Sequence, residues 1–545
     1  MPPTHTPETR SVVLAALLGL LNHLYFHRFT PKSAGGPILV LIAQPVLLLF
    51  AISAPISLAR ILITYVTFLS TLSASIVVYR LSPWHPLAHI PGPVLYKITK
   101  LWSTRIVASG QSHRVTKALH EDYGGFVRTG PNEISVIEVD AVKAVFGTGG
   151  FPKGEYYDSR KDPRLTSRNL LILRGEAHSH RRRIWNRGMS TESIDEYESA
   201  ILAKRVNQFM DKLEGLQGTP FDISAWFGYF TFDVMGDMAF GGGFEMLRDG
   251  GDKEGLWALI KSGGKSLAIV SQIPWIAPLL HKIPGATQGI KRLRGFGAAC
   301  AMERIKAGAK VKDLWYHLTD EVGLEKSKPQ ISDVAADGVL SIVAGSDTTS
   351  TVLAAFIWLL LSHPDVYRRV QAEIDSVYSD VESTLDSSKH ADLKLLTACL
   401  NESLRLQPSV CTGGPRQVPE GQGKMVAGQF VPEHTQIYIP PYSLHRNPEY
   451  FSDPEKFDPD RWLRPESSEF THNSAAFIPF SYGAANCVGK ALAVREMTMV
   501  ASALVRRFEM RFAEGFEEQC WGDMLCDYFI TSIEVPLMVE ISRRR

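Results

Sequence analysis

The chain has 545 residues, and its 58 basic and 57 acidic side chains leave a net charge of +1. This balance gives no reason to expect a nucleic acid or another polyanion as a partner. Hydrophobic residues make up 45% of the chain, which is enough for a large core, and the six cysteines show neither zinc nor disulfide spacing. We therefore expect one large catalytic domain with reduced thiols, typical of a protein that faces the cytosol.

Residues 1–80 carry three apolar segments, Ser11–Phe26, Pro37–Ala59 and Ile61–Tyr79. The last two are uncharged and about long enough to cross a bilayer. The first is shorter and is interrupted by Asn22 and His23. No small-residue cleavage site follows it, so the sequence predicts a retained membrane anchor of two or three transmembrane segments.

Residues 81–93 form a proline-rich segment that contains Pro83, Pro86 and the run Pro91-Gly92-Pro93. Prolines prevent helix formation and stiffen the backbone. Trp84 suits the interface between lipid and water. We expect a hinge here, between the anchor and a domain that covers residues 94–545.

Apolar residues recur at helical spacing through much of this domain, whereas short strand patterns gather between Pro408 and Pro441. This mixture predicts a mainly α fold with minor β sheets. The clearest predicted helices are Asp222–Phe240, Ile331–Ser362, Asp365–Val377 and Leu393–Leu406.

A basic run extends from His178 to Trp185. Such a run usually forms a solvated cationic helix face. His178 and Arg182 are four residues apart, however, so on a helix they share one face and could together bind a buried carboxylate.

The predicted helix 331–362 contains Ala344-Gly345-Ser346-Asp347-Thr348-Thr349. The Thr348 hydroxyl can bond back to the carbonyl of Ala344, bend the helix and open a groove, while the small Ala344 leaves room for a cofactor. With Asp347 nearby, an acid and an alcohol could deliver protons during catalysis. The alternative is a kinked core helix with a solvated Asp347.

Glu402 and Arg405 lie three residues apart among leucines. On a surface such a pair contributes little stability. Buried, the loss of one partner costs on the order of 3–5 kcal/mol. The surrounding leucines favour the buried interpretation and a structural role.

A lone cysteine, Cys487, lies in the loop Phe480–Gly489, just before an amphipathic segment. Gly483 and Gly489 allow a tight turn beneath a flat ligand. Amides at the start of the following helix can donate to the sulfur, and Phe480 can limit the access of water. The loop suits a thiolate ligand to haem iron, although an isolated cysteine is more often a buried structural thiol.

This loop resembles the haem-binding signature of the cytochrome P-450 family, Phe-x-x-Gly-x-x-x-Cys-x-Gly, at every fixed position. The run Ala344–Thr349 resembles the I-helix motif of that family, and Glu402-x-x-Arg405 resembles its K-helix motif. The run Phe457–Trp462 resembles the partner motif, in which Arg461 completes a cluster with Glu402 and Arg405. The resemblance covers the chain from about Pro83 onward and implies the haem-thiolate fold of the family.

The resemblance also implies haem b with Cys487 as its axial thiolate and only metal ligand, and with Gly345 beside the cofactor. His178, Arg182 and Arg416 are then the expected donors to the haem propionates. Most family members carry a basic residue two positions before the cysteine, where this chain has Ala485. Another donor must replace it.

By the same resemblance we expect a monooxygenase in the endoplasmic reticulum membrane, with its catalytic domain in the cytosol. An NADPH-cytochrome reductase would supply electrons, with cytochrome b5 as a second donor, and the free arginines of the basic run could face that partner. The segments that could contact substrate, Phe151–Tyr157, Val410–Gly414 and Tyr528–Thr531, show no clustered charge. They favour an apolar small molecule such as a terpenoid or another secondary metabolite.

Two alternatives remain open at this point. The first is a haem-thiolate isomerase or dehydratase that rearranges peroxides, and the second is a membrane haem protein that is not an enzyme. The pair Asp347-Thr348 argues against both, because proton delivery is needed for oxygen activation.

Overall fold

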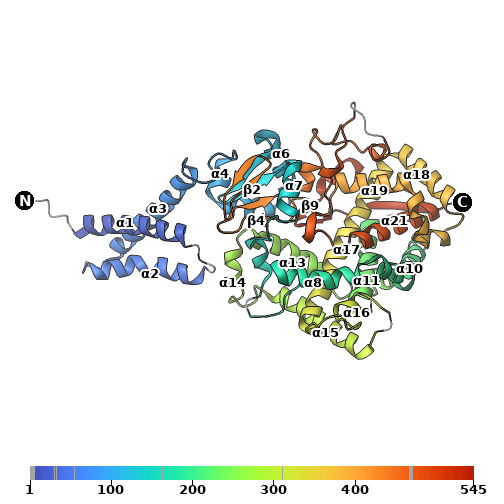
Figure 1. The fold of residues 1–545 in the computed structure, drawn as a ribbon, viewed down its shortest axis with the longest axis horizontal. Coiled ribbons are helices and arrows are strands. Elements are labelled where there is room, and N and C mark those ends of the chain that lie inside the picture. Colours follow the sequence, from blue (N-terminus) through green and yellow to red (C-terminus); the bar gives the residue numbers. More distant parts are fainter. Residues whose placement is uncertain are drawn as a thin grey trace, which may run out of the picture.

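The computed structural model describes residues 7–29, 31, 34–53, 56–162, 164–242, 244–309, 311–464 and 470–544. Three N-terminal helices project from one end, and the rest of the chain forms a body of helices with small sheets (Figure 1). The predicted fold class, mainly α with minor β, is confirmed.

The three projecting helices are α1 (Pro7–Arg28), α2 (Gly35–Ala51) and α3 (Leu58–Leu81). Stretches of α1 and α3 are long and apolar enough to cross a membrane. The expected span Pro37–Ala59 is wrong as a single segment, because α2 ends at Ala51 and Ser57 caps the start of α3. Residues 54 and 55 of that span lie outside the described part of the chain. With 17 residues, α2 is about 25 Å long, less than the hydrocarbon thickness of a bilayer.

Close packing and polar contacts hold these three helices together. A Cβ atom at Gly19 of α1 would lie 2.8 Å from the carbonyl oxygen of Phe68 on α3, so glycine permits the close approach. Asn22 donates to the side chain of Gln44 at 2.7 Å, and His23 is hydrogen-bonded to Ser75 at 2.6 Å. Asn22 and His23, which interrupt the apolar pattern of the first segment, therefore face the other helices.

The proline-rich segment that follows α3 is packed onto the body. Leu87 and Ile90 are buried in the core that surrounds the largest sheet. Arg128 donates its backbone N–H to the Pro91 carbonyl at 2.7 Å, and Gly92 has a φ of +155°. A side chain at Gly92 would collide with the Arg128 carbonyl. These contacts fix the direction in which the chain leaves α3.

The described helices of the body vary from single turns to one of 32 residues. The α-helices are α4 (Val94–Ile98), α5 (Lys100–Ala108), α6 (Ser112–Tyr123), α7 (Val139–Phe146), α8 (Gly175–Gly188), α9 (Thr191–Tyr197), α10 (Ala203–Glu214), α11 (Ile223–Phe240), α12 (Met246–Asp249), α13 (Leu256–Ser271), α14 (Ala277–Leu280), α15 (Gln288–Ala307), α16 (Leu314–Leu318), α17 (Ile331–Ser362), α18 (Pro364–Val377), α19 (Lys394–Leu406), α20 (Pro441–Leu444) and α21 (Lys490–Arg507). The shorter 3-10 and π turns are η1 (Glu155–Arg160), η2 (Glu198–Leu202), η3 (Pro274–Ile276), η4 (Glu382–Leu385), η5 (Ser387–Asp392), η6 (Pro459–Trp462), η7 (Ser474–Ala476), η8 (Gly483–Ala485) and η9 (Glu518–Met524).

The strands form four small sheets. The largest has the order β1-β2-β7-β4, in which β2 and β7 are parallel and the other pairs are antiparallel. A second sheet has the order β3-β11-β8, and two hairpins, β5-β6 and β9-β10, complete the set. Their bounds are β1 (Phe126–Gly130), β2 (Glu133–Val136), β3 (Phe221–Asp222), β4 (Arg416–Gln417), β5 (Lys424–Val426), β6 (Gln429–Val431), β7 (Gln436–Tyr438), β8 (Phe508–Phe512), β9 (Cys526–Tyr528), β10 (Ile530–Ser532) and β11 (Met538–Arg543).

The long helix α17 runs through the middle of the body and packs along α11 (Figure 1). It is also apolar enough to cross a membrane, but two-thirds of that stretch is buried inside the protein, so it belongs to the core. Its bounds match the prediction, and the other three predicted helices begin within one residue of the observed ones. The core around α17 includes fully buried aromatic rings such as Phe227, Phe230 and Phe356.

Candidate active site

A cavity of about 600 Å³ lies between α17, the loop before α21, and segments from α8, α13 and the β9–β10 hairpin. Cys487 and Thr348, which are 139 residues apart in the chain, both line it. The cavity therefore brings together the loop and the helix motif that the sequence singled out separately.

The backbone before Cys487 turns tightly. Gly483 has a φ of +74°, and a Cβ atom there would lie 1.9 Å from the Phe146 carbonyl oxygen, so only glycine fits. The Cys487 N–H donates to the Phe480 carbonyl at 2.9 Å and closes the loop. Phe480 is partly buried against the main core, as its predicted packing role requires.

The surroundings of the Cys487 sulfur act on its charge in two directions. Burial raises the pKa of the thiol, whereas a hydrogen bond from the Gly489 backbone and the charges of Arg182 and Lys490 oppose that rise. No atom would obstruct a side chain at Gly489 within 4 Å, so this glycine leaves open space beside the sulfur. The predicted amide donor to the sulfur is thus present.

Cys411 is the other cysteine close to this region, but it does not line the cavity. Its thiol donates to the Pro408 carbonyl at 3.1 Å and is hydrogen-bonded to the Thr531 hydroxyl at 3.3 Å. Among the described residues Cys487 is the only cysteine on the cavity wall. The two thiols therefore differ in position, because Cys487 lines the cavity and Cys411 does not.

The acid and the alcohol of α17 also lie on the cavity wall. The Thr348 hydroxyl donates to the Ala344 carbonyl at 2.7 Å, which confirms the predicted bond. Asp347 accepts a hydrogen bond from the indole N–H of Trp257 on α13 at 3.0 Å, and burial raises the pKa of its carboxyl group. The sequence does not mark Trp257, because nothing in its local pattern distinguishes it from a core tryptophan.

Gly345 has a different role from the one expected. A Cβ atom there would lie 2.5 Å from the Met235 sulfur on α11, so the glycine permits close packing of two helices. Its backbone still borders the cavity. The small side chain that leaves room for a cofactor is therefore that of Ala344, which also lines the cavity.

Among the described residues seven basic side chains line the same cavity, and we call four of them, Lys153, His178, Arg182 and Arg416, the cation cluster. Arg182 donates to the backbone and side-chain oxygens of Asn486, both at 2.7 Å. Lys153 donates to the carbonyls of Leu170 and Leu171 at 3.0 and 2.8 Å.

Burial and mutual repulsion within the cation cluster lower the pKa of Lys153 to about 7 and that of His178 to about 4. Among the described residues no carboxylate lies within 4 Å of any member of the cluster. Arg416 is buried and the other three cations are half-buried, and such a group without an acid is costly unless an anion joins it. Two propionates supply that charge, so the cluster fits the carboxylate edge of a haem.

Lys153 was not predicted as a cofactor contact, since its segment was expected to face substrate. Its ammonium group has three donors, and two of them already bind carbonyls. The third is available to replace the donor that is missing at Ala485. No local signal marks this role, because Lys153 reaches the site only through the fold.

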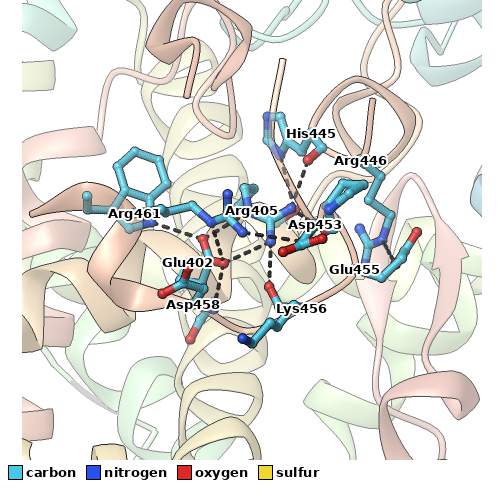
Figure 2. Close-up of polar contacts among 12 residues, drawn as sticks. Glu402, Arg405, His445, Arg446, Asp453, Glu455, Lys456, Asp458 and Arg461 are labelled. Atoms are coloured by element: carbon cyan, nitrogen blue, oxygen red, sulfur yellow. Dashed lines mark hydrogen bonds and ion pairs between the residues drawn. The ribbon is translucent and has the colours of Figure 1, made fainter. Parts of the chain in front are cut away.

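A second group of charges is fully buried, and we call its members Glu402, Arg405 and Arg461 the scaffold cluster (Figure 2). Glu402 binds Arg405 at 2.8 Å and Arg461 at 2.9 Å, and all three side chains are fully buried. The Trp462 indole N–H and the Asp458 backbone N–H add two further donors to Glu402. The predicted cluster is present.

His445 connects the scaffold cluster to the chain that leads into the Cys487 loop (Figure 2). Its Nε2 atom accepts the N–H of Ile478 at 2.9 Å, and its Nδ1 atom lies 3.3 Å from the Arg405 carbonyl oxygen. Burial and the neighbouring Arg405 and Arg446 lower the pKa of His445 to about 3. The sequence analysis missed this residue, which has no motif partner nearby in the chain.

Comparison with known proteins agrees with this geometry. Residues 89–520 match the family model of cytochrome P450. The chain belongs to the cytochrome P450 family. Members of this family are haem-thiolate enzymes with an axial cysteine, so this P450 is a haem-dependent monooxygenase.

Several fungal proteins are similar to the chain over most of its length. The chain is 34% identical over 461 residues to a trichothecene C-15 hydroxylase of Fusarium sporotrichioides. That alignment covers 81% of this chain and 90% of the relative. It is 31% identical over 484 residues to a tryprostatin B 6-hydroxylase of Aspergillus fumigatus, with 88% and 84% covered. It is also 33% identical over 444 residues to the cytochrome P450 monooxygenase FCK2 of Fusarium pseudograminearum, with 81% and 79% covered.

Proposed function

We propose that this P450 is a membrane-anchored monooxygenase that oxidises an apolar small molecule of secondary metabolism, with Cys487 as the axial ligand of its haem. One observation carries the proposal: Cys487 and the pair Asp347-Thr348 line one cavity. The named activities of the fungal relatives, hydroxylation of a trichothecene and of tryprostatin B, support the class of substrate.

Haem, when bound, supplies the activation of dioxygen and the insertion of one oxygen atom into a carbon–hydrogen bond. The Gly489 amide and the positive charges of Arg182 and Lys490 favour the anionic form of the Cys487 sulfur. Phe480 packs against the main core and lines the cavity together with Cys487, where it would limit the access of water once the haem is bound. The cation cluster would hold the propionates of the haem.

The groups of the cavity wall that can transfer protons, Thr348 and Asp347, lie on α17. The Thr348 hydroxyl gives its hydrogen to the Ala344 carbonyl, so its oxygen remains an acceptor toward the cavity. Asp347 has a raised pKa and can hold and release a proton beside that groove. Trp257 fixes the orientation of the carboxyl group.

The anchor and the partners belong to the same proposal. Helices α1 to α3 are compatible with membrane attachment of residues 1–80, with residues 81–93 as the hinge and residues 94–545 as the catalytic domain. The cytosolic face of the endoplasmic reticulum is the proposed location. An NADPH-cytochrome reductase is the proposed donor, with cytochrome b5 as a second one.

The arginines of α8 offer less surface to such a donor than the sequence indicates. Arg181 is paired with Asp333 and Asp337, at 2.8 and 2.7 Å. Arg183 and Arg187 both bind Glu325. Of these three arginines only Arg183 is mostly exposed. We therefore expect a reductase to contact a smaller area of α8 than the sequence indicates.

The test is the carbon monoxide difference spectrum of the reduced protein in microsomes. We expect the strongly red-shifted Soret band of a thiolate-ligated haem, and its loss in Cys487→Ser but not in Cys411→Ser. A band that survives in Cys487→Ser would show that the ligand is wrong. The absence of any haem band in folded wild-type protein would overturn the proposal.

The role of the acid and alcohol is tested by Thr348→Ala. We expect haem binding to stay intact while electrons are diverted from product to hydrogen peroxide. A ratio of product to NADPH equal to that of the wild type would contradict proton handling at Thr348.

A further inference from the structure

Three cations on the cavity wall lie outside the cation cluster: Arg160, Lys261 and Lys265. Arg160, the last residue of η1, lines the cavity and is half-buried. The elements that frame it are α13 and the β9–β10 hairpin, which supply neither the Cys487 loop nor the cation cluster. Arg160 and Lys153 lie over the same Tyr157 ring, 5.6 and 5.9 Å from its centroid, so Arg160 adjoins the cation cluster on the side toward α13.

Neutral groups hold this guanidinium in place. Its central carbon lies 4.9 Å from the ring centroids of both Tyr156 and Phe529, and 5.6 Å from that of Tyr157. It donates to the Ser271 hydroxyl at 2.8 Å and more weakly to the Tyr156 carbonyl at 3.4 Å. Among the described residues no carboxylate lies within 4 Å of Arg160. The arginine is thus fixed in position while its charge has no protein counterion.

The ring above Arg160 is held in an uncommon backbone conformation. Phe529 has a φ of +78°, which is costly for a residue with a bulky side chain. The carboxylate of Asp527 stabilises it by accepting the Phe529 N–H at 3.0 Å, and the Asp527 N–H donates to the Gly110 carbonyl at 2.8 Å. Strain that is kept in place by its surroundings is typical of residues that position a ligand.

We propose that Arg160 binds a carboxylate of the substrate, so that this P450 oxidises an apolar carboxylic acid. A fixed guanidinium in a mostly apolar cavity is best satisfied by a planar anion that accepts two hydrogen bonds. The aromatic rings around it would contact the adjoining apolar part of the substrate. This proposal adds a carboxylate to the apolar substrate that the sequence predicts. The inference rests on the proposed monooxygenase function.

The experiment compares acids with their methyl esters. Equilibrium dialysis of the full-length holoprotein in detergent at neutral pH would measure the dissociation constants of dodecanoate, cinnamate and abietate and of their methyl esters. We expect the wild type to bind at least one acid about tenfold more tightly than its ester, the effect of one charge-assisted contact. Arg160→Gln should reduce that ratio to about one, and Arg160→Lys should retain part of it.

Lys265 provides the matched control. It also lines the cavity as a cation, over the ring of Tyr528 at 4.8 Å, but it is exposed to solvent. Lys265→Gln should leave the ratio of acid to ester unchanged. An equal loss in this variant would mean that the general potential of the cavity, and not Arg160, selects acids.

Three results would overturn the proposal: no preference for any acid in the wild type, a preference that survives in Arg160→Gln, or loss of haem in that variant. The last would assign Arg160 to the propionates. The carbon monoxide band of each sample reports the haem-thiolate state independently of dialysis. A failure of the proposed function is thus separable from a failure at Arg160.

Discussion

The scaffold cluster is a fully buried group of charges and the cation cluster is half-buried apart from the buried Arg416, and the two are built in opposite ways. Glu402 neutralises much of the charge of Arg405 and Arg461, and backbone carbonyls accept their remaining donors. The cation cluster has no acid within 4 Å among the described residues, and its charges lower the pKa of Lys153.

This difference separates groups that belong to the fold from groups that await a ligand. A buried charge that the protein itself neutralises stabilises the fold, because removing its partner leaves an uncompensated ion. Buried like charges oppose folding until an anion binds. The two clusters should therefore respond to substitution in opposite ways.

The largest effect is expected in the scaffold cluster. Glu402→Gln leaves two buried arginines without their anion and should lower the free energy of unfolding by about 3–5 kcal/mol. Urea unfolding followed by circular dichroism would measure it. Glu196→Gln is the control, because Glu196 pairs with Lys312 and the two side chains are 37% and 58% exposed, so its loss should cost less than about 1 kcal/mol. Similar values for both variants would remove the distinction between the clusters.

Acid should weaken the link between the scaffold cluster and the Cys487 loop. The pKa of His445 is about 3 in the folded protein, below its ordinary value of 6.5, so the folded state binds fewer protons than the unfolded state. Its contribution is complete above pH 6.5 and is lost as the pH falls toward 3. By pH 5 the loss is about 2 kcal/mol.

The measurement is the unfolding free energy of wild type and His445→Gln between pH 7.5 and pH 5. The variant should be less stable at neutral pH, but its stability should fall less steeply as the pH decreases. Parallel curves would show that His445 is not the group that titrates.

In the cation cluster the same kind of substitution should spare the protein and weaken the ligand. Arg416 is buried, and its guanidinium lies 4.9 Å from the Phe146 ring without an acid nearby. Arg416→Met should leave the unfolding free energy of the haem-free protein unchanged or higher. Haem transfer to apomyoglobin should be about tenfold faster, from loss of one charged contact. Arg183→Met, at an exposed ion pair, should change neither.

The smallest effect concerns a single buried charge, Asp347, whose carboxylate has one neutral donor. Trp257→Phe removes that donor and should raise the pKa of Asp347 further. We expect coupling of electron use to product to fall about threefold. Product formed per NADPH would measure it, with Trp226→Phe as the control, because Trp226 packs on Tyr229 and does not line the cavity. Equal coupling in both variants would show that the tie to Trp257 is not used.

The sequence predicts the scaffold cluster more completely than the cation cluster. Glu402 and Arg405 lie on one helix turn, so their spacing along the chain already places them together. The members of the cation cluster come from a loop, from α8 and from β4, and they meet only in the folded protein. Its two helical members, His178 and Arg182, were predicted because they lie four residues apart and so are neighbours on α8. Lys153 was not, because no local spacing connects it to them.

The anchor shows the same limit at its boundaries. Composition predicted apolar helices, but the break between Ala51 and Leu58 depends on a serine cap and on how α2 packs against its neighbours. A hydropathy average along the sequence does not show where a helix ends or where the next one begins.

By itself the sequence determined the helices of the core, the turn at Gly483, the bond from Thr348 to Ala344 and the position of Cys487, since each depends on residues only a few positions apart. The tertiary structure alone decided that Trp257 reaches Asp347, that His445 supports the Cys487 loop, and that Arg160 lies in the cavity without a counterion. These contacts join segments that are distant in the chain. Local periodicity carries no record of them, because packing of the whole fold brings them together.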